Sequence, residues 1–287
     1  MKGSKTDSKT YSDDSHTIIH GDALENLQRL EPASVDLIFA DPPYNIGKNF
    51  DGLVENWSTT DFLSWTYQWI EACDRVLKPK GSFYLMNSTE NMPYLDIKCR
   101  QHFYIKSRIV WAYDSSSVQA KKYFGSMYEP ILMLTKHEKD YTFNADAIKV
   151  EAKTGTKRQL IDYRKNPPQP YSTDKVPGNV WNFSRVRFKM EEYENHPTQK
   201  PEALLQRIIL ASSNPGEVVL DPFSGSFSTS AVAKRLGRKS IGIEINEAYV
   251  KIGIRRLGIP SDYSAEALIK TKRRKTKNLS KRVRDFS

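Results

Sequence analysis

Cysteine is scarce in this chain of 287 residues, which contains only Cys73 and Cys99. Two cysteines are too few for a disulfide framework, and their spacing matches neither a zinc site nor a redox-active pair. The sequence therefore predicts a protein of a reducing compartment, the cytoplasm, and implies no metal.

Long apolar runs are also lacking. No segment approaches the roughly 18 uninterrupted apolar residues of a membrane-spanning helix. Residues 1–15 are polar and do not have the charged start and apolar stretch of an export signal. We therefore expect a soluble, cytoplasmic protein without a membrane partner. A Gly-x-Gly-x-x-Gly element after a strand is missing too, which argues against a nicotinamide-dependent enzyme.

Positive charge, by contrast, is in excess and is concentrated in two segments. The chain has 44 lysines and arginines against 34 acidic residues, a formal net charge of +10. Residues 270–287 hold nine basic groups and one acidic group, and residues 149–189 hold ten and three. This distribution indicates a nucleic-acid partner. The run at 270–287 has the composition of a disordered, nonspecific phosphate tether.

Four short apolar runs lead into an acidic residue, as buried parallel strands do when they deliver polar groups to one edge of a sheet. The pairs of run and acid are 17–20 with Asp22, 35–40 with Asp41, 218–220 with Asp221, and 240–243 with Glu244. Ligands of open α/β sheets bind outside the carboxyl ends of the strands. The acids are therefore candidate site residues, although each of them alternatively caps the helix that follows.

Helical patterns alternate with these strands. They cover residues 61–77, with Asp61 as a candidate N-cap, 202–212 and 228–236, and further strand candidates are 81–86 and 107–111. An irregular region at about 137–195 is rich in Pro, Lys, Asn and aromatic residues. We therefore expect one α/β catalytic domain over residues 16–269 with this region as an insertion, and disordered segments at 1–15 and 270–287.

The tetrapeptide Asp41-Pro42-Pro43-Tyr44 directly follows the strand candidate at 35–40. Its prolines fix φ and have no N–H, so the turn is stiff and its carbonyls only accept hydrogen bonds. Such a pocket suits an amino group, because the Asp41 carboxylate and the Pro42 carbonyl can hold the two hydrogens and favour a tetrahedral, nucleophilic nitrogen. Tyr44 offers a stacking surface for an aromatic ring. A Pro-Pro turn without function is the alternative.

The tetrapeptide resembles the catalytic motif of amino-directed DNA methyltransferases, where a first-position Asp usually accompanies adenine N6 and a Ser accompanies cytosine N4. The resemblance implies methyl transfer from S-adenosylmethionine to the N6 amino group of an adenine in a specific double-stranded DNA sequence. The adenine must be flipped out of the duplex, with Tyr44 compensating for the stacking that the base gives up by roughly 1–3 kcal/mol. The reaction needs in-line placement of nitrogen and methyl, and Asp41 then helps to remove the released proton.

A second segment, residues 221–229, has the pattern of a ligand-binding turn between a strand and a helix. Its small residues let the backbone approach a ligand, and Glu244, 19 residues after Gly225, can bind both hydroxyls of a ribose. An ordinary strand-helix turn is the alternative. The segment resembles the cofactor loop of the same family, except that the family usually has Gly where this chain has Phe227. The substitution removes backbone freedom at that position.

Two further elements resemble the family. Residues 196–201, His-Pro-Thr-Gln-Lys-Pro, resemble the element near the methionine part of the cofactor, with Lys200 suited to its carboxylate. Residues 21–24 resemble the element that receives the cofactor adenine, with Asp22 as acceptor; helix starts are the alternative for both elements. The resemblance implies the following cofactor-binding residues: Asp22, Ala23, Asp41, Thr198, Lys200, Asp221, Pro222, Phe223, Gly225, Ser226, Glu244 and Ile245.

The catalytic strand precedes the cofactor loop, with the insertion between them, which resembles the circularly permuted β arrangement of the family. The resemblance covers about residues 16–257 and implies a Rossmann-like, mostly parallel sheet of about seven strands with helices on both faces, and a target-recognition role for the insertion. Residues 86–91 and 113–116 resemble an orphan adenine methyltransferase type within the family. The candidate DNA-binding residues are Arg158, Arg164, Lys165, Arg185 and Arg187. Trp111 and Tyr113 are candidate base-pocket residues, with core packing as the alternative for Trp111.

Other functions stay open. The amino group can instead be cytosine N4 or belong to RNA; a glutamine amide is disfavoured, because enzymes of that type usually have Asn where this chain has Asp41. A silent nucleic-acid-binding module is the alternative from another class, which the intact motifs disfavour. Cytosine C5 methylation needs a nucleophilic cysteine, and neither cysteine follows a proline. We expect a monomer or a homodimer.

Overall fold

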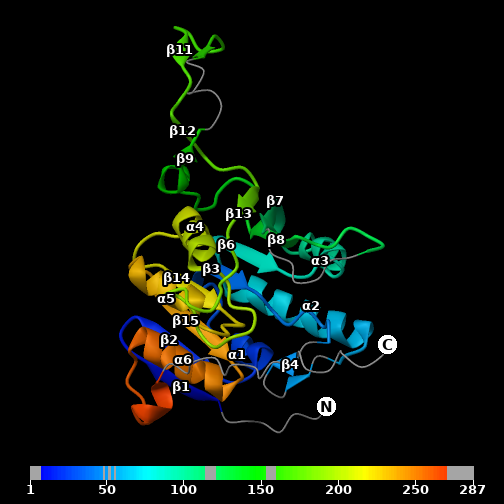
Figure 1. Ribbon diagram of the computed structural model, residues 1–287, viewed down its shortest axis with the longest axis vertical. Coiled ribbons are helices and arrows are strands. Elements are labelled where there is room, and N and C mark those ends of the chain that lie inside the picture. Colours follow the sequence, from blue (N-terminus) through cyan, green and yellow to red (C-terminus); the bar gives the residue numbers. More distant parts are fainter. Residues whose placement is uncertain are drawn as a thin grey trace, which may run out of the picture.

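The computed structural model describes residues 8–47, 49–50, 53–54, 56–113, 121–152 and 160–269. Its centre is a sheet of nine strands in the order β1-β2-β15-β14-β3-β6-β8-β7-β13 (Figure 1). The bounds are β1 Lys9–Ser12, β2 His16–His20, β3 Val35–Ala40, β6 Leu77–Met86, β7 Tyr104–Ala112, β8 Tyr128–Thr135, β13 Val180–Asn182, β14 Val218–Asp221 and β15 Lys239–Glu244. Within this sheet β1 and β8 run antiparallel to their neighbours, and the other pairings are parallel.

The expectation of a mostly parallel α/β sheet is confirmed, but the number of about seven strands is wrong. The two edge strands explain part of the difference. β1 has one buried side chain in four, so it lacks an apolar run, and β13 is only three residues long. Neither strand has the apolar–polar alternation or the apolar run by which strands are predicted from a sequence.

Helices cover both faces of the sheet, as expected. One face carries α1 Ala23–Arg29, α2 Thr59–Val76 and α3 Met92–Cys99, and the other carries α4 Glu202–Ser212, α5 Ser228–Arg235 and α6 Glu247–Leu257. In β3 the alternation places Ile38 and Ala40 in the core under α2, and Leu37 and Phe39 in the core under α4. A strand buried on both faces has no polar face, which is why its sequence reads as one apolar run.

The start of α2 differs from the expectation. The N-cap is Ser58, whose Oγ accepts a hydrogen bond from Asp61 N at 3.1 Å, and not Asp61. Asp61 lies in the first turn, where its carboxylate accepts from Ser58 Oγ at 2.7 Å. Ser58 thus caps the helix, and the Asp61 carboxylate orients the capping hydroxyl.

The insertion forms an arm that extends away from the body (Figure 1). It contains two short antiparallel pairs, β9 Val150–Glu151 with β12 Asp174–Lys175, and β10 Ile161–Asp162 with β11 Gln169–Pro170. A third pair, β4 Asn49–Phe50 with β5 Leu53–Val54, precedes α2. Short 3-10 helices lie at Ala145–Ile148 and Glu266–Leu268.

Part of the N-terminal segment that we expected to be disordered is a strand, since β1 pairs with β2 from Lys9 to Ser12. Residues 1–7 and the basic run 270–287 lie outside the described residues. Among the described helices, none combines the length and the apolar character needed to cross a bilayer.

Candidate active site

Polar side chains from six neighbouring strands meet at one edge of the sheet. The parallel strands β2, β15, β14, β3 and β6 end there, and the antiparallel β8 begins there, so that Met86 pairs with Ile131. The residues delivered to this edge are Asp22, Glu244, Asp221, Asp41, Asn87 and Glu129. Strand polarity, and not sequence proximity, therefore builds the site.

Asp41 and Tyr44 form the centre of a compact polar cluster. The Tyr44 hydroxyl lies 2.6 Å from Asp41 Oδ1 and 3.1 Å from Glu129 Oε2. Lys200, from the loop before α4, places its Nζ 2.5 Å from Asp41 Oδ2 and 3.7 Å from Glu129 Oε2. The Asn91 side chain donates to the Tyr44 carbonyl at 2.7 Å, which fixes the turn of the tetrapeptide from the α3 side.

The cluster is shielded from water, and burial therefore dominates its electrostatics. Burial raises the pKa of Asp41, and the Lys200 ammonium opposes that rise. Burial lowers the pKa of Lys200, but Asp41 and Glu129 outweigh it and raise that pKa overall, so Lys200 is protonated at neutral pH. The pKa of the Tyr44 phenol is raised well above its ordinary value by burial and by both carboxylates, so Tyr44 remains a neutral donor.

Arg185 closes one side of the cluster. Its guanidinium carbon lies 3.9 Å from the centre of the Tyr113 ring, and its Nη2 lies 3.5 Å from Glu129 Oε1. Trp111 is buried behind Tyr113 and donates from Nε1 to the Phe183 carbonyl at 2.8 Å. Trp111 thus packs in the core, whereas Tyr113 and Arg185 line the cluster.

The loop after β14 is held by two carboxylates, one buried and one half-buried. Asp221 accepts from Thr229 Oγ1 at 2.6 Å and from Phe223 N at 3.0 Å. Glu244 accepts from Gly225 N and from Asn246 N, both at 2.8 Å. Burial raises the pKa of each carboxyl to about 7. The Glu244 carboxylate thus lies against the loop that the sequence pairs with it.

Gly225 occupies a place that no other residue fits without rearrangement. Its φ is +49°, and a Cβ atom there would lie 2.8 Å from His196 Nε2. The His196 ring packs at 4.5 Å from the Tyr249 ring, and burial lowers its pKa to about 3, so it is neutral at physiological pH. The backbone of the loop consequently approaches the 196–201 segment closely, with Pro222 and Ser226 also buried.

Phe227, where the family usually has Gly, adopts the left-handed φ of +56° that glycine favours. Its side chain is fully buried beside Ile18, Val250 and Ile254. The loop therefore keeps a glycine-like backbone with an aromatic side chain.

The other predicted cofactor-binding residues lie outside this loop. Asp22 Oδ1 caps α1 by accepting from Glu25 N at 2.9 Å, and Ala23 is buried in the first turn. Ile245 is 52% exposed. Thr198 is half-buried, and its carbonyl accepts from Lys200 Nζ at 3.2 Å. Lys200 contacts Asp41, whereas the resemblance places it at the cofactor carboxylate.

The candidate DNA-binding residues are not brought together. Arg164 and Lys165 lie on the arm, where Arg164 Nε donates to Asp162 Oδ1 at 2.8 Å. Arg187 is exposed in the segment after β13, Arg185 belongs to the cluster described above, and Arg158 lies outside the described residues.

Glu129 was missed in the sequence. It stands before the apolar run of β8, at the start of a strand, and acids at strand starts ordinarily lie at the opposite edge of a parallel sheet. Only the antiparallel direction of β8 brings Glu129 to the site. The sequence signal for Glu129 was its place directly before Pro130 and the apolar run of β8.

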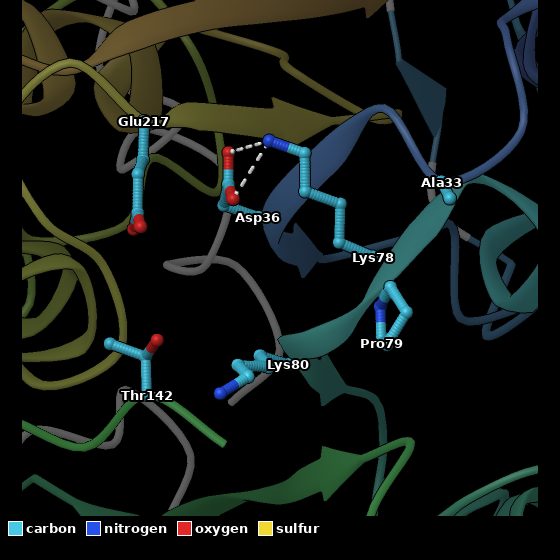
Figure 2. Close-up of a pocket in the computed structure, with 7 residues that line it drawn as sticks. All are labelled: Ala33, Asp36, Lys78, Pro79, Lys80, Thr142 and Glu217. Carbon is cyan, nitrogen blue, oxygen red and sulfur yellow. Dashed lines mark hydrogen bonds and ion pairs between the residues drawn. The ribbon is translucent and has the colours of Figure 1, made fainter. Parts of the chain in front are cut away.

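A depression of about 500 Å³ lies at the other edge of the sheet, where β3, β6 and β14 begin (Figure 2). Lys78 Nζ contacts both carboxylate oxygens of Asp36 there, at 2.9 and 2.8 Å, and Asp36 also accepts from Val218 N. These hydrogen bonds connect the starts of the three strands, so we assign the depression a structural role. Among the described residues, no group of His, Cys, Asp and Glu side chains is arranged to hold a metal ion.

The chain is similar to known DNA methylases along most of its length. A family model described as DNA methylase matches residues 35–255. DNA adenine methyltransferase YhdJ of Escherichia coli (strain K12) is 68% identical over 274 residues, which cover 96% of this chain and 93% of that protein.

Solved structures show the same fold. The cytosine-N4-specific PvuII DNA methyltransferase aligns over 90% of this chain and 91% of its own, with a TM-score of 0.68 at 18% identity. The complex of M1.HpyAVI with S-adenosylmethionine aligns over 84% and 98%, with a TM-score of 0.59 at 25% identity.

Proposed function

Because this chain belongs to the DNA methylase family, we propose that it transfers a methyl group from S-adenosylmethionine to the N6 amino group of adenine in double-stranded DNA. The family resemblance read from the sequence is confirmed. The base assignment draws support from the first-position acid, Asp41, and from the 68% identity to an adenine methyltransferase. The single observation that carries the proposal is the contact of the partly buried Asp41 and Tyr44 at the end of β3, the strand next to β14, which leads into the glycine loop.

The residues at this edge fit S-adenosylmethionine. Gly225 lets the backbone of the loop come close to a ligand, and Glu244 presents a carboxylate directly at that loop. We assign Glu244 to the ribose hydroxyls, the 221–226 loop to the methionine part and Asp22 to the adenine amino group. The bound donor supplies an electrophilic methyl group on a sulfonium.

The tetrapeptide performs the protein's part of the chemistry. Asp41 and the Pro42 carbonyl accept the two N6 hydrogens of a flipped adenine and so localise the lone pair on nitrogen, while Tyr44 stacks on the base. Asp41 then takes the proton that the methylated nitrogen releases. Because Lys200 and Tyr44 both contact Asp41, they hold its oxygens in one orientation before the base arrives.

The test is methyl transfer from labelled S-adenosylmethionine to DNA, RNA and protein, with nucleoside mass analysis. Asp41→Ala is expected to abolish turnover and to leave cofactor affinity within about a few fold, since the residue acts on the reacting nitrogen. Asp140→Ala, which removes an exposed carboxylate paired with Lys80, is the matched control and keeps full activity. N4-methylcytosine as product, or turnover by Asp41→Ala, contradicts the proposal.

The remaining assignments follow from this function. We assign residues 9–269 to the catalytic domain, because β1 belongs to its sheet, the insertion at 137–195 to target recognition and residues 270–287 to phosphate binding. The partner is double-stranded DNA, and the protein acts in the cytoplasm without a metal, as a monomer or homodimer.

A further inference from the structure

The Glu129 side chain contacts three members of the active-site cluster, Tyr44, Lys200 and Arg185. Its Oε2 lies 3.1 Å from the Tyr44 hydroxyl and 3.7 Å from Lys200 Nζ, and its Oε1 lies 3.5 Å from Arg185 Nη2. The Glu129 side chain is only 16% exposed, and that of Lys200 8%. A carboxylate with both oxygens directed at functional groups in such a shielded place is costly to keep unless its contacts are used.

Charge balance explains why a second carboxylate is needed beside Asp41. The groups around Glu129 come from four elements: Asp41 and Tyr44 after β3, Tyr113 at the end of β7, Arg185 after β13 and Lys200 before α4. Two carboxylates face two cations in this set. Without Glu129, Arg185 would lose its carboxylate partner and Lys200 would depend on Asp41 alone, the one group that must remain able to accept hydrogens from the target base.

We propose that Glu129 is a positioning residue for methyl transfer: it holds the Tyr44 phenol and the Lys200 ammonium and balances their surroundings, so that Asp41 can accept from the amino group. The inference rests on the proposed function and adds a residue to it. Tyr44 is restrained at its hydroxyl by Asp41 and Glu129 and at its carbonyl by Asn91, so its ring is held before a base stacks on it. Lys200 keeps a partner when Asp41 turns to the substrate.

Glu129→Gln removes the negative charge and keeps the side-chain length. Glu129→Asp keeps the charge on a side chain that is one methylene shorter. In Glu129→Gln, kcat is expected to fall by about ten- to a hundredfold, as for a small misplacement of reacting groups, while KM for S-adenosylmethionine stays within about threefold. Glu129→Asp recovers at least part of kcat. Glu138→Gln, which removes an exposed carboxylate beyond the other end of β8, leaves kcat unchanged.

A second readout does not depend on the reaction. The pKa of Lys200 is measured by nuclear magnetic resonance of ¹³C-labelled lysine side chains, with the signal assigned by its disappearance in Lys200→Arg. Since Glu129 raises the pKa of Lys200, that pKa falls in Glu129→Gln, and because Glu129 also raises the pKa of Asp41, the acid limb of the kcat profile moves to lower pH.

Two results would overturn the assignment. One is a Glu129→Gln enzyme with kcat within about twofold of wild type and an unmoved Lys200 pKa. The other is a parallel loss of kcat and thermal stability with no change in either pH profile and no recovery by Glu129→Asp, which marks a purely structural role. A wild-type protein that methylates no adenine while its Lys200 pKa still responds to Glu129→Gln refutes the proposed function and leaves the contacts of Glu129 established.

Discussion

Phe227 combines a glycine-like backbone with a large apolar side chain at the start of α5. Cβ atoms built on Gly242 and Gly253 would each lie 2.6 Å from its ring, so these two glycines provide the space that the ring occupies. Left-handed backbone in a residue other than glycine costs about 1–3 kcal/mol. Burial of the ring must outweigh this cost, because the side chain packs with residues of β1, β2 and α6 in one apolar cluster.

Phe227→Gly should therefore destabilise the protein, although it restores the residue that the family usually has. Loss of a buried aromatic ring costs about 3–5 kcal/mol, and relief of the backbone strain returns part of it, so the free energy of unfolding should fall by about 2 kcal/mol. Urea denaturation measures the change. Phe227→Leu, which keeps the strain and most of the apolar volume, is the control and should lose less. Equal or higher stability of Phe227→Gly would show that strain outweighs packing here.

His196 makes stability depend on pH through its burial beside Gly225. Its pKa is about 3 in the folded protein, and a histidine in an unfolded chain titrates near 6.5. The unfolded state consequently binds more protons between these values, and folding loses stability as the pH falls below about 6.5.

His196→Gln should remove this dependence. Between pH 7 and pH 5 the histidine contributes a loss of about 2 kcal/mol, so the variant's unfolding free energy should decline by about that much less over the interval. Asp221 and Glu244, with pKa values of about 7, act in the opposite direction, because folding keeps their protons up to higher pH. They are common to both proteins, so the difference between denaturation series at pH 5, 6 and 7 isolates His196. Parallel series would contradict the assignment.

At the scale of elements, the sequence predicts the strands and helices whose pattern of buried apolar residues is regular along the whole segment. The run at 35–40 and the helix at 202–212 have the bounds of β3 and α4, because the strand is apolar on both faces and the helix has a continuous apolar stripe. The candidate site follows from the same signal wherever an acid ends a parallel strand. Glu129 escapes it because the direction of β8 is set by its pairing with β6 and β7, which no local pattern encodes.

The sequence predicts the inserted arm as irregular, and its short strand pairs bury no apolar side chain. Ile161 and Tyr163 are 44% and 78% exposed. Surface that is apolar and basic, and not needed to fold the sheet, suits a role in contacting DNA beside the flipped base. Arg185, at the base of the insertion, belongs instead to the active site, so the insertion has parts with two roles.

Removal of the arm should separate recognition from folding. Ala152 N donates to the Thr173 carbonyl at 2.9 Å, so an Asn-Gly turn can replace residues 153–172 between paired strand ends. We expect an unfolding free energy within about 1 kcal/mol of wild type, because shortening an exposed loop changes stability little. Cofactor affinity by calorimetry should be unchanged, whereas affinity for the recognised DNA by fluorescence anisotropy should fall by about tenfold or more. Unaltered selectivity among DNA sequences would exclude target recognition by the arm.

In the whole molecule, positive charge occurs both in the active site and in the basic run 270–287. The active-site cations Lys200 and Arg185 are matched by buried carboxylates and add little to the field outside. Most of the net charge of +10 belongs to residues 270–287, which hold nine basic groups and one acidic group. Charge of this kind raises affinity for any duplex without selecting a sequence.

Truncation after Ile269 should accordingly weaken DNA binding mainly through its salt dependence. The slope of log affinity against log salt concentration becomes shallower by roughly 0.9 for each phosphate that the shortened protein no longer neutralises, so several such phosphates produce a clear change. Because the active-site groups all lie before this point, kcat at saturating DNA should be unchanged. A full-length variant with the nine basic residues replaced by glutamine separates charge from length and should behave as the truncation does. If both proteins keep the wild-type slope, phosphate binding resides in the arm and the body, and the basic run is not a tether.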